Sequence, residues 1–363
     1  MNILAPIADL GNYILFSLLV GHVVLQFVPE SKKPAIQLPK SLLLICILGI
    51  IVLTFVPVLT VILFFDQSAG FITKAATVLT SFQIGQAWLF ITLFGIFLWL
   101  TVYLERSKYL QAFWLVLMII AIGYGSHVSS KSFVVGIFSH TTHFLMVTIW
   151  VGVLLLVSFF SKNKENWSDF LQWFTPLAVV CLVNIFATGF VIMFTIDEPT
   201  EYLNGWATQY GRMLLFKHIS IIPIIMFAII NGLLSKRVSK STEYDPRTWL
   251  KAECVILLLV FYFTAILGTI SPPNEMVYQV KMADPPTWME WLLAKDILVP
   301  IEIEFAPTLL SVLLITSALL FLLLIIISYK KMSPIFATVF GGCFIFTLYL
   351  GLMFSCVLYP IIY

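Results

Sequence analysis

Residues 133–160 read FVVGIFSHTTHFLMVTIWVGVLLLVSFF and contain no Asp, Glu, Lys or Arg. An α-helix needs about 20 predominantly apolar residues to cross the hydrocarbon core of a bilayer, and this stretch is long enough. It nevertheless carries two histidines, His140 and His143. Polar side chains at membrane depth are energetically costly and are therefore candidates for function. The stretch predicts a membrane-spanning helix that carries part of a functional site.

The composition of the whole chain agrees with this prediction. Of the 363 residues, 61% are hydrophobic and only 10% are charged, whereas an ordinary soluble domain has about 25% charged residues. So few charges cannot cover the surface of a water-soluble globule. Secreted disulfide scaffolds, nucleic-acid binders and disordered proteins are therefore excluded. The chain is expected to have membrane lipid as its main solvent and no nucleic-acid partner.

Further segments of the chain have the same length and apolar character. Together the predicted spans lie at about 4–28, 40–65, 80–104, 110–126, 133–160, 169–195, 211–234, 249–270, 305–328 and 334–361. The stretch 66–79 is expected either on the outer membrane interface or as an extension of the third span. The segment 288–298, within the longest loop, is expected to form an outer interfacial helix. The predicted fold class is an all-α, polytopic bundle of about ten transmembrane helices.

The loops between these spans predict the orientation. Most of the 20 Lys and Arg fall in alternate loops, whereas acidic residues gather in the other set. Cytoplasmic loops carry the excess of Lys and Arg, so the basic set is expected in the cytoplasm. Both termini then lie outside, which an even number of spans requires. The chain is predicted to be a multi-pass protein of the bacterial cytoplasmic membrane with extracytoplasmic termini.

All five histidines fall in or at the ends of predicted spans. His140 and His143, at positions i and i+3, lie about 60° apart on one helix and close enough to line one site. His127 is expected to close the fourth span, and His218 lies in the outer half of the seventh. His22, near the cytoplasmic end of the first span, is the exception. Four histidines are thus expected near the outer leaflet.

The chemistry that suits these side chains is that of copper. Imidazole binds both copper oxidation states, and thioether ligands favour Cu(I). Hard cations need carboxylates, which the spans almost lack. The predicted ligands of a copper ion, Cu(I) or Cu(II), are His127, His143, His140, His218, Met213 and Met193. An alternative stays open, because an intramembrane histidine is often a hydrogen-bonded packing residue and a methionine is usually core filler.

Other polar or sulfur-bearing residues at membrane depth are given supporting roles. Trp150 is expected to seal the site from below, and Tyr210 to support it. Lys217 is expected to neutralise a carboxylate or to bind backbone carbonyls, since a cation repels a metal ion. An inward path, ordered by depth alone, is predicted to pass Cys181, Asn184, Met226, Cys254 and His22.

A set of short motifs runs through the fourth to eighth spans. It consists of Ser126-His127-Val128, His143-Phe144-Leu145, Trp150-Val151-Gly152, Trp173-Phe174, Thr188-Gly189, Gln209-Tyr210-Gly211-Arg212, Leu214-Leu215, Lys217, Leu267-Gly268 and Ser271-Pro272-Pro273. This pattern resembles the copper resistance protein D (CopD) family over about residues 120–275. The resemblance implies an integral membrane protein that moves copper across the cytoplasmic membrane, usually described as uptake.

The resemblance also implies roles for particular residues and partners. His127 and His143 match the family's histidines, and Tyr210, Gly211 and Lys217 match its Tyr-Gly-x-x-x-x-x-Lys pattern. An extracytoplasmic copper-binding donor of CopC type is implied as a partner, because no such domain fits outside the spans of this chain. The predicted domains are 1–126, an N-terminal four-helix membrane bundle; 127–275, a CopD-like membrane domain; and 276–363, the interfacial loop helix with two further membrane helices.

Two other functions use the same residues. Histidines at one depth on neighbouring helices can ligate haem axially, as in a membrane b-type cytochrome that transfers electrons. A copper-delivery factor for oxidase assembly would bind copper without transporting it. The chain has no G-x-x-x-x-G-K-[ST] motif and no large cytoplasmic loop for an ATPase. It is therefore expected not to be an enzyme, and any transport to be passive or ion-coupled.

Overall fold

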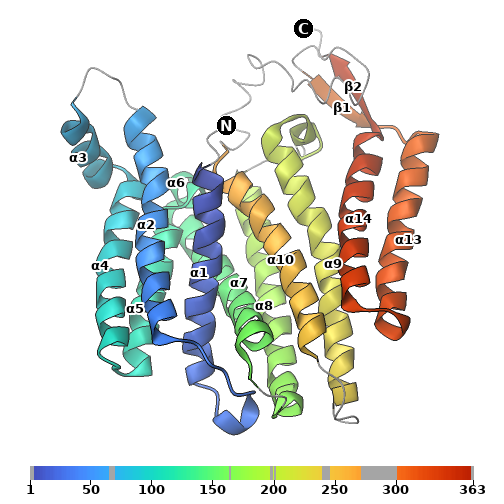
Figure 1. The fold of residues 1–363 in the computed structure, drawn as a ribbon. Helices are drawn as coiled ribbons and strands as arrows, with labels where there is room; N and C mark the ends of the chain where they lie inside the picture. The colour runs from blue at the N-terminus through green and yellow to red at the C-terminus, as the bar shows by residue number, and fades with distance from the viewer. Residues whose placement is uncertain are drawn as a thin grey trace. The chain divides into compact units, whose positions relative to one another are not determined.

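The fold is almost entirely helical (Figure 1). The computed structural model describes residues 4–64, 70–162, 165–196, 199, 202–238, 246–270 and 301–360. Its helices are α1 (Leu4–Gln26), α2 (Lys40–Phe64), α3 (Phe71–Ser81), α4 (Gln83–Tyr103), α5 (Lys108–Tyr124), α6 (His127–Lys131), α7 (Phe133–Phe160), α8 (Trp167–Ile196), α9 (Gln209–Val238), α10 (Arg247–Gly268), α13 (Leu309–Lys331) and α14 (Pro334–Met353). Short 3₁₀ turns are η1 (Glu30–Lys32) and η3 (Asn204–Ala207), and the strands are β1 (Ile301–Phe305) and β2 (Cys356–Pro360).

The predicted spans are present as helices, but the bounds of the last two are wrong. The ninth helix begins at Leu309 rather than 305, and the tenth ends at Met353 rather than 361, because Ile301–Phe305 and Cys356–Pro360 pair as strands β1 and β2. Within the described residues, nine helices are long and apolar enough to cross a membrane, and α5 is a shorter apolar helix of 17 residues. The all-α polytopic fold is thus confirmed, and the protein is a multi-pass membrane protein. The segment 66–79 does not extend the third span. Phe82 has an extended backbone and separates α3 from α4. The helix expected at 288–298 lies outside the described residues.

The chain folds into two compact units. The first comprises Met1–Thr195 and Leu234–Lys251, and the second comprises Ile196–Leu233 and Ala252–Tyr363. The predicted domains, with boundaries after residues 126 and 275, stay a prediction. They follow the extent of the family resemblance, whereas these two units are defined by how closely their residues pack.

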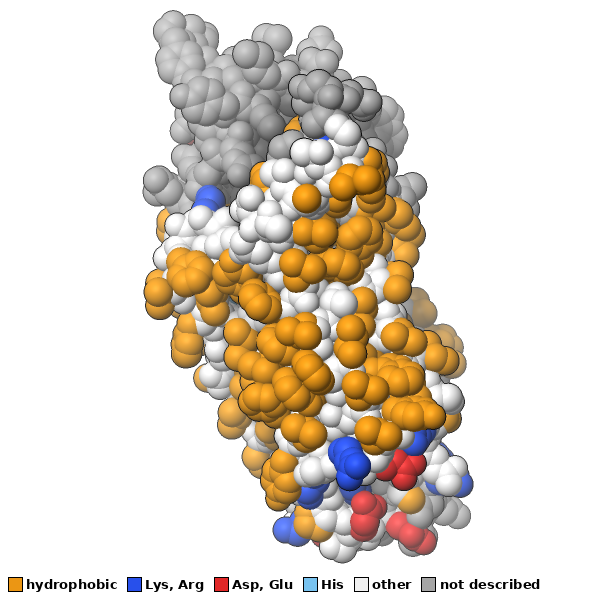
Figure 2. All heavy atoms as spheres, turned by 90° about the vertical axis from the view of Figure 1, so that its left-hand side faces the viewer, with side chains coloured by type: hydrophobic (Ala, Val, Ile, Leu, Met, Phe, Trp, Pro, Cys, Tyr) orange, Lys and Arg blue, Asp and Glu red, His pale blue; other side chains and the backbone are white. Residues whose placement is uncertain are grey.

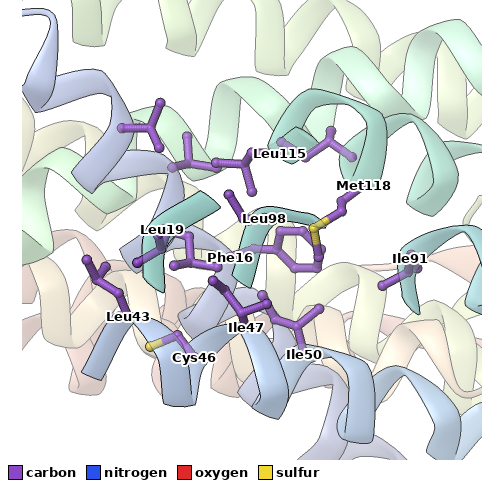
Figure 3. Packing of buried hydrophobic residues seen from close by; sticks show 14 of the residues in the cluster. Phe16, Leu19, Leu43, Cys46, Ile47, Ile50, Ile91, Leu98, Leu115 and Met118 are labelled. Atoms are coloured by element: carbon purple, nitrogen blue, oxygen red, sulfur yellow. The ribbon is translucent and has the colours of Figure 1, made fainter. Parts of the chain in front are cut away.

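The core of the first unit is formed by α1, α2, α4, α5 and α7. Phe16 of α1 is fully buried, as are Ile47 of α2 and Met118 of α5. Figure 3 shows these side chains meeting in one apolar cluster. Phe16 also meets Phe144 of α7 edge to face, with 5.2 Å between ring centroids, a favoured aromatic geometry. The first helix is therefore central to this unit.

The backbones of α1 and α7 approach each other at two glycines. A Cβ atom placed on Gly152 would overlap the carbonyl oxygen of Ser17, and one placed on Gly21 would overlap the Gly152 carbonyl group. Lipid gives little hydrophobic drive for helix association, so membrane helices pack through small residues that allow such close contact. Gly21 and Gly152 therefore fix how α1 lies on α7.

The basic loops of the first unit lie at one end of its helices. The Lys40 ammonium group donates to the Glu105 carboxylate at 2.7 Å, and the Asn166 amide donates to the Glu30 carbonyl oxygen at 3.1 Å. Arg247 donates to the Ser161 carbonyl oxygen at 3.4 Å. Figure 2 shows a hydrophobic face on which the Asp and Glu side chains and most of the Lys and Arg side chains in view lie at one end. The position of these loops at one end of the unit agrees with helices that cross the membrane in alternating directions. That this end faces the cytoplasm stays a prediction.

The Lys40–Glu105 pair gives a test of this end of the structure. The hydrogen bond from Lys40, followed by its positive charge, lowers the pKa of Glu105 from its ordinary value of 4.5. A carboxyl whose pKa falls on folding stabilises the protein above its unfolded pKa, and this contribution disappears as the pH falls through the folded pKa.

Glu105→Gln should therefore lower the thermal midpoint slightly at neutral pH, because exposed ion pairs contribute little. The difference from wild type should vanish in acid, and it should shrink with added salt. Thermal unfolding in detergent, compared across pH with Glu304→Gln as an exposed control, measures it. A difference that widens as the pH falls contradicts the assignment.

The second unit joins the two C-terminal helices to α9. Its core contains Trp206 of η3, Ile219 of α9, and Phe344 and Met353 of α14. The Phe216 ring of α9 stacks on the Tyr349 ring of α14, with 3.9 Å between centroids. Strands β1 and β2 pair antiparallel, with Ile301 opposite Pro360. The helices α13 and α14, for which sequence predicted no role, thus form part of the same packed unit as α9.

Candidate metal site

The most informative polar contact in the first unit joins α7 to α8. The Nδ1 atom of His143 lies 3.1 Å from the Thr188 hydroxyl oxygen. That hydroxyl donates its proton to the Asn184 carbonyl oxygen at 2.6 Å. A hydroxyl has a single proton, so toward His143 it acts as acceptor and Nδ1 carries the hydrogen. The Nε2 atom then holds the lone pair with which a neutral imidazole binds metal.

The imidazole ring of His143 lies close to the backbone of α8 at Gly189. A Cβ atom on Gly189 would lie 3.6 Å from the Cε1 atom of His143, so the α8 backbone comes close to the ring. The helices run antiparallel, because the short connection after Phe160 joins two long spans. His140 lies about one turn before His143 on α7, and Met193 lies about one turn after Gly189 on α8. Because the helices are antiparallel, these two turns extend in the same direction from the His143–Thr188 contact. His140, His143 and Met193 thus occupy neighbouring levels of the two helices.

The other predicted outer ligands lie elsewhere in the fold. His127 is exposed and is the first residue of α6, where the Ser126 hydroxyl accepts a hydrogen bond from the Ser129 amide at 3.2 Å. The expectation that His127 closes the fourth span is wrong, because α5 ends at Tyr124 and the Ser126 cap starts a new helix. Whether His127 binds metal stays a prediction.

His218, in the second unit, has a partner that sequence reasoning missed. Its Nδ1 atom lies 2.8 Å from the Tyr202 hydroxyl group. Burial raises the pKa of the Tyr202 phenol, so this group keeps its proton at neutral pH. A phenol both donates and accepts, and the contact therefore leaves both neutral tautomers open to His218. Tyr202 lies in a connection between spans, where hydrophobic periodicity carries no signal.

Residues 168–267 match the family Copper resistance protein D (CopD). The chain contains a CopD segment. This finding confirms the predicted family resemblance over α8, α9 and α10, and the family it matches is one associated with copper. No curated protein and no solved structure matches the chain. Thr188 belongs to the CopD segment, whereas His127, His140 and His143 precede it.

The CopD segment also contains most of the predicted supporting residues. Cys181 and Cys254 are fully buried, and Tyr210 is buried. Those that are partly buried are Asn184, Met193, Met213, Lys217 and Met226. Trp150, which precedes the segment, is buried in α7. Their roles in a path or a seal stay predictions.

His22 lies at the basic end of the first unit, away from the CopD segment in sequence. The Gln26 amide donates to its Nε2 atom at 2.7 Å and to the Gln111 side-chain oxygen at 3.0 Å. The Lys33 ammonium group binds the Leu25 carbonyl oxygen at 2.7 Å, and the Lys108 ammonium group binds the Gln26 carbonyl oxygen at 3.1 Å. A metal ion passing His22 would therefore meet positive charge.

The described part of the chain contains no preformed metal site of three or more His, Cys, Asp or Glu ligands. There, no three His, Cys, Asp or Glu side chains lie close enough together to hold an ion. Thioethers are outside that set of residue types. A copper site with three or more protein ligands in the described residues would therefore have to include another ligand type, such as a methionine thioether, and a set of histidine and methionine suits Cu(I).

Proposed function

We propose that this protein takes up copper across the cell membrane through a site between α7 and α8. The observation that carries the proposal is the bond between His143 and Thr188, which directs the lone pair of His143 to Nε2. Metal-binding histidines are usually oriented in this way by a partner on the other ring nitrogen. The partner residue belongs to the CopD segment, which connects the geometry to copper.

The proposed ligands of the first unit are His143, His140 and Met193. Their position at neighbouring levels of an antiparallel helix pair supports this choice. Two imidazoles and one thioether form a ligand set that Cu(I) accepts. His127, His218 and Met213 are proposed as ligands along the entry route, where an extracytoplasmic donor of CopC type would release copper. The basic loops are proposed to face the cytoplasm.

A membrane b-type cytochrome is the second candidate. An axial haem ligand also has its free ring nitrogen oriented by a hydrogen-bond partner, so the His143–Thr188 contact fits haem as well. The CopD match favours copper. A copper-delivery factor would use the same ligands without moving the ion through the membrane.

Three measurements on the full chain separate these functions. Protein purified in detergent should bind near-stoichiometric copper by elemental analysis and should show no strong Soret absorption. Lipid vesicles that contain the protein should accumulate copper faster than empty vesicles. A strong Soret band would overturn the proposal in favour of a cytochrome. Bound copper with accumulation equal to that of empty vesicles would overturn transport in favour of delivery.

A further inference from the structure

The second unit contains a carboxyl group buried among membrane helices. Glu253 of α10 is only 2% exposed, and its Oε2 atom accepts a hydrogen bond from the Asn231 amide of α9 at 2.6 Å. Asn231 is itself 7% exposed. Both residues lie in apolar helices that are long enough to cross the membrane. Ionisable side chains in such helices are rare and usually mark ion pathways or proton relays.

The Glu253 carboxyl has no cation beside it in the described part of the chain. The ion pairs there join Lys33 to Glu30 and Lys40 to Glu105. The nearest described cation on α10 is Lys251, an exposed residue whose ammonium group lies 5.4 Å from the centre of the Phe159 ring. The hydrogen-bond donor that the structure shows at Glu253 is therefore a neutral amide.

Among the side chains that the structure describes on α9 and α14, none that carries a charge lies near Glu253. On α9 the charged or titratable residues whose side chains the structure describes are Tyr210, Arg212, Lys217 and His218, and the nearest of them in sequence is about 20 Å along the helix from Asn231. Lys236 and Arg237 also belong to α9 and follow Asn231 by five and six residues, toward the end of the helix. On α14, where a Cβ atom placed on Gly341 would lie 3.2 Å from the Ile256 side chain of α10, the titratable residues are Cys343 and Tyr349. On α10 itself they are Cys254 and Tyr262, besides Arg247 and Lys251 at its start.

One amide hydrogen bond does not offset the cost of a full negative charge in an apolar interior. A bound positive ion does, and the smallest one available is a proton. Oε1 is the atom that takes it, because Oε2 already accepts the Asn231 hydrogen bond. The protonated carboxyl keeps that bond unchanged, so a proton can bind or leave without disturbing the contact between α9 and α10.

We propose that Glu253 is a proton-binding site within the membrane, and that it releases its proton when copper moves through the protein. The second half rests on the proposed copper transport. Release breaks the O–H bond at Oε1 and sends the proton to solvent, leaving a carboxylate whose negative charge offsets that of the copper ion. Return of a proton restores the neutral acid after copper has left. Transport is then an exchange of copper for protons.

The first test needs no copper. The infrared spectrum of the purified full chain should contain C=O stretching absorption from buried protonated carboxyls, and Glu253→Gln should remove a component that Asp9→Asn leaves in place. Glutamine keeps the size of the side chain and an oxygen that accepts from Asn231, so the fold should persist. Asp9→Asn, at the other membrane-embedded carboxyl of the described helices, is the matched control. A band unchanged in Glu253→Gln overturns the proposal.

The second test follows protons and copper in lipid vesicles that enclose a pH-sensitive dye. Addition of copper outside should change the internal pH in vesicles containing wild type, and Glu253→Gln should reduce this change to the level of empty vesicles. An equal pH change in wild type and Glu253→Gln overturns the proposal. If wild type moves no copper, the proposed function fails and with it the exchange, whereas the infrared band still decides whether Glu253 holds a proton.

Discussion

His143→Ala should abolish stoichiometric copper binding by the purified protein. The change removes the imidazole whose Nε2 lone pair is set by the Thr188 contact. Within the described residues, no group of three or more His, Cys, Asp or Glu side chains lies close enough together to hold the ion instead. Elemental analysis of protein reconstituted with copper measures the loss. The double variant His127→Ala with His143→Ala should show the same absence of copper.

The control for this change is His22→Ala. His22 is also a partly buried helical histidine, but it lies at the basic end of α1 and binds Gln26. Its copper content should equal that of wild type. Copper content that is unchanged in His143→Ala, or lost equally in His22→Ala, would sink the proposed site.

Thr188→Val gives the graded version of the same test. Valine matches threonine in shape and removes the oxygen that accepts from His143. Loss of such an orienting partner typically weakens metal binding about 10–100-fold. Thr188→Ser keeps the hydroxyl and should retain most of the affinity, measured by competition with a Cu(I) chelator. Equal affinities for the valine and serine variants would show that the hydroxyl does not orient a ligand.

The largest effect on stability is expected for Gly152→Val. A side chain there collides with the backbone of α1 at Ser17 and Gly21, which cannot move aside as a flexible side chain can. Overpacking usually costs about 1–3 kcal/mol, and a clash with backbone belongs at the upper end. Gly152→Ala should give a smaller loss of the same sign. Thermal unfolding in detergent ranks the two variants against wild type.

A glycine with open space around it is the control. Gly342 lies in α14, and a Cβ atom placed there meets nothing within 4 Å. Gly342→Ala should leave the thermal midpoint equal to or above that of wild type, because alanine is the better helix former. A midpoint that falls as far in Gly342→Ala as in Gly152→Val would show that glycine loss itself, rather than the α1–α7 contact, is responsible.

The spans were predictable because a membrane imposes a simple rule on sequence. A helix such as α2, with its long apolar run, satisfies every backbone hydrogen bond internally and needs only length and hydrophobicity. The separation of α3 from α4 was not predictable, since it depends on the backbone conformation of Phe82. The start of α6 at His127 depends in the same way on one cap, at Ser126.

The candidate site was predictable in its residue types and not in its contacts. His143 could be found because histidine is rare in lipid. Thr188 stands in an apolar helix where threonine usually binds its own backbone, as it also does here with Asn184. Only the packing of α7 against α8 reveals its second role. Glu253 was given no role because it lies near the end of a predicted span, where polar residues are common, and its partner Asn231 is revealed only by the packing of α9 and α10.

The close contact between Gly21 and Gly152 also sets a requirement on synthesis. The two glycines are far apart in the chain, and at about 5–20 residues per second the ribosome needs on the order of 10 s to add the intervening residues. During that time α1 is already in the bilayer without the helix that its small residues fit. Its remaining partners in this interval are α2 and, later, α5. Completion of the first unit therefore waits for a helix made late, and the first four membrane helices must be held together until it arrives.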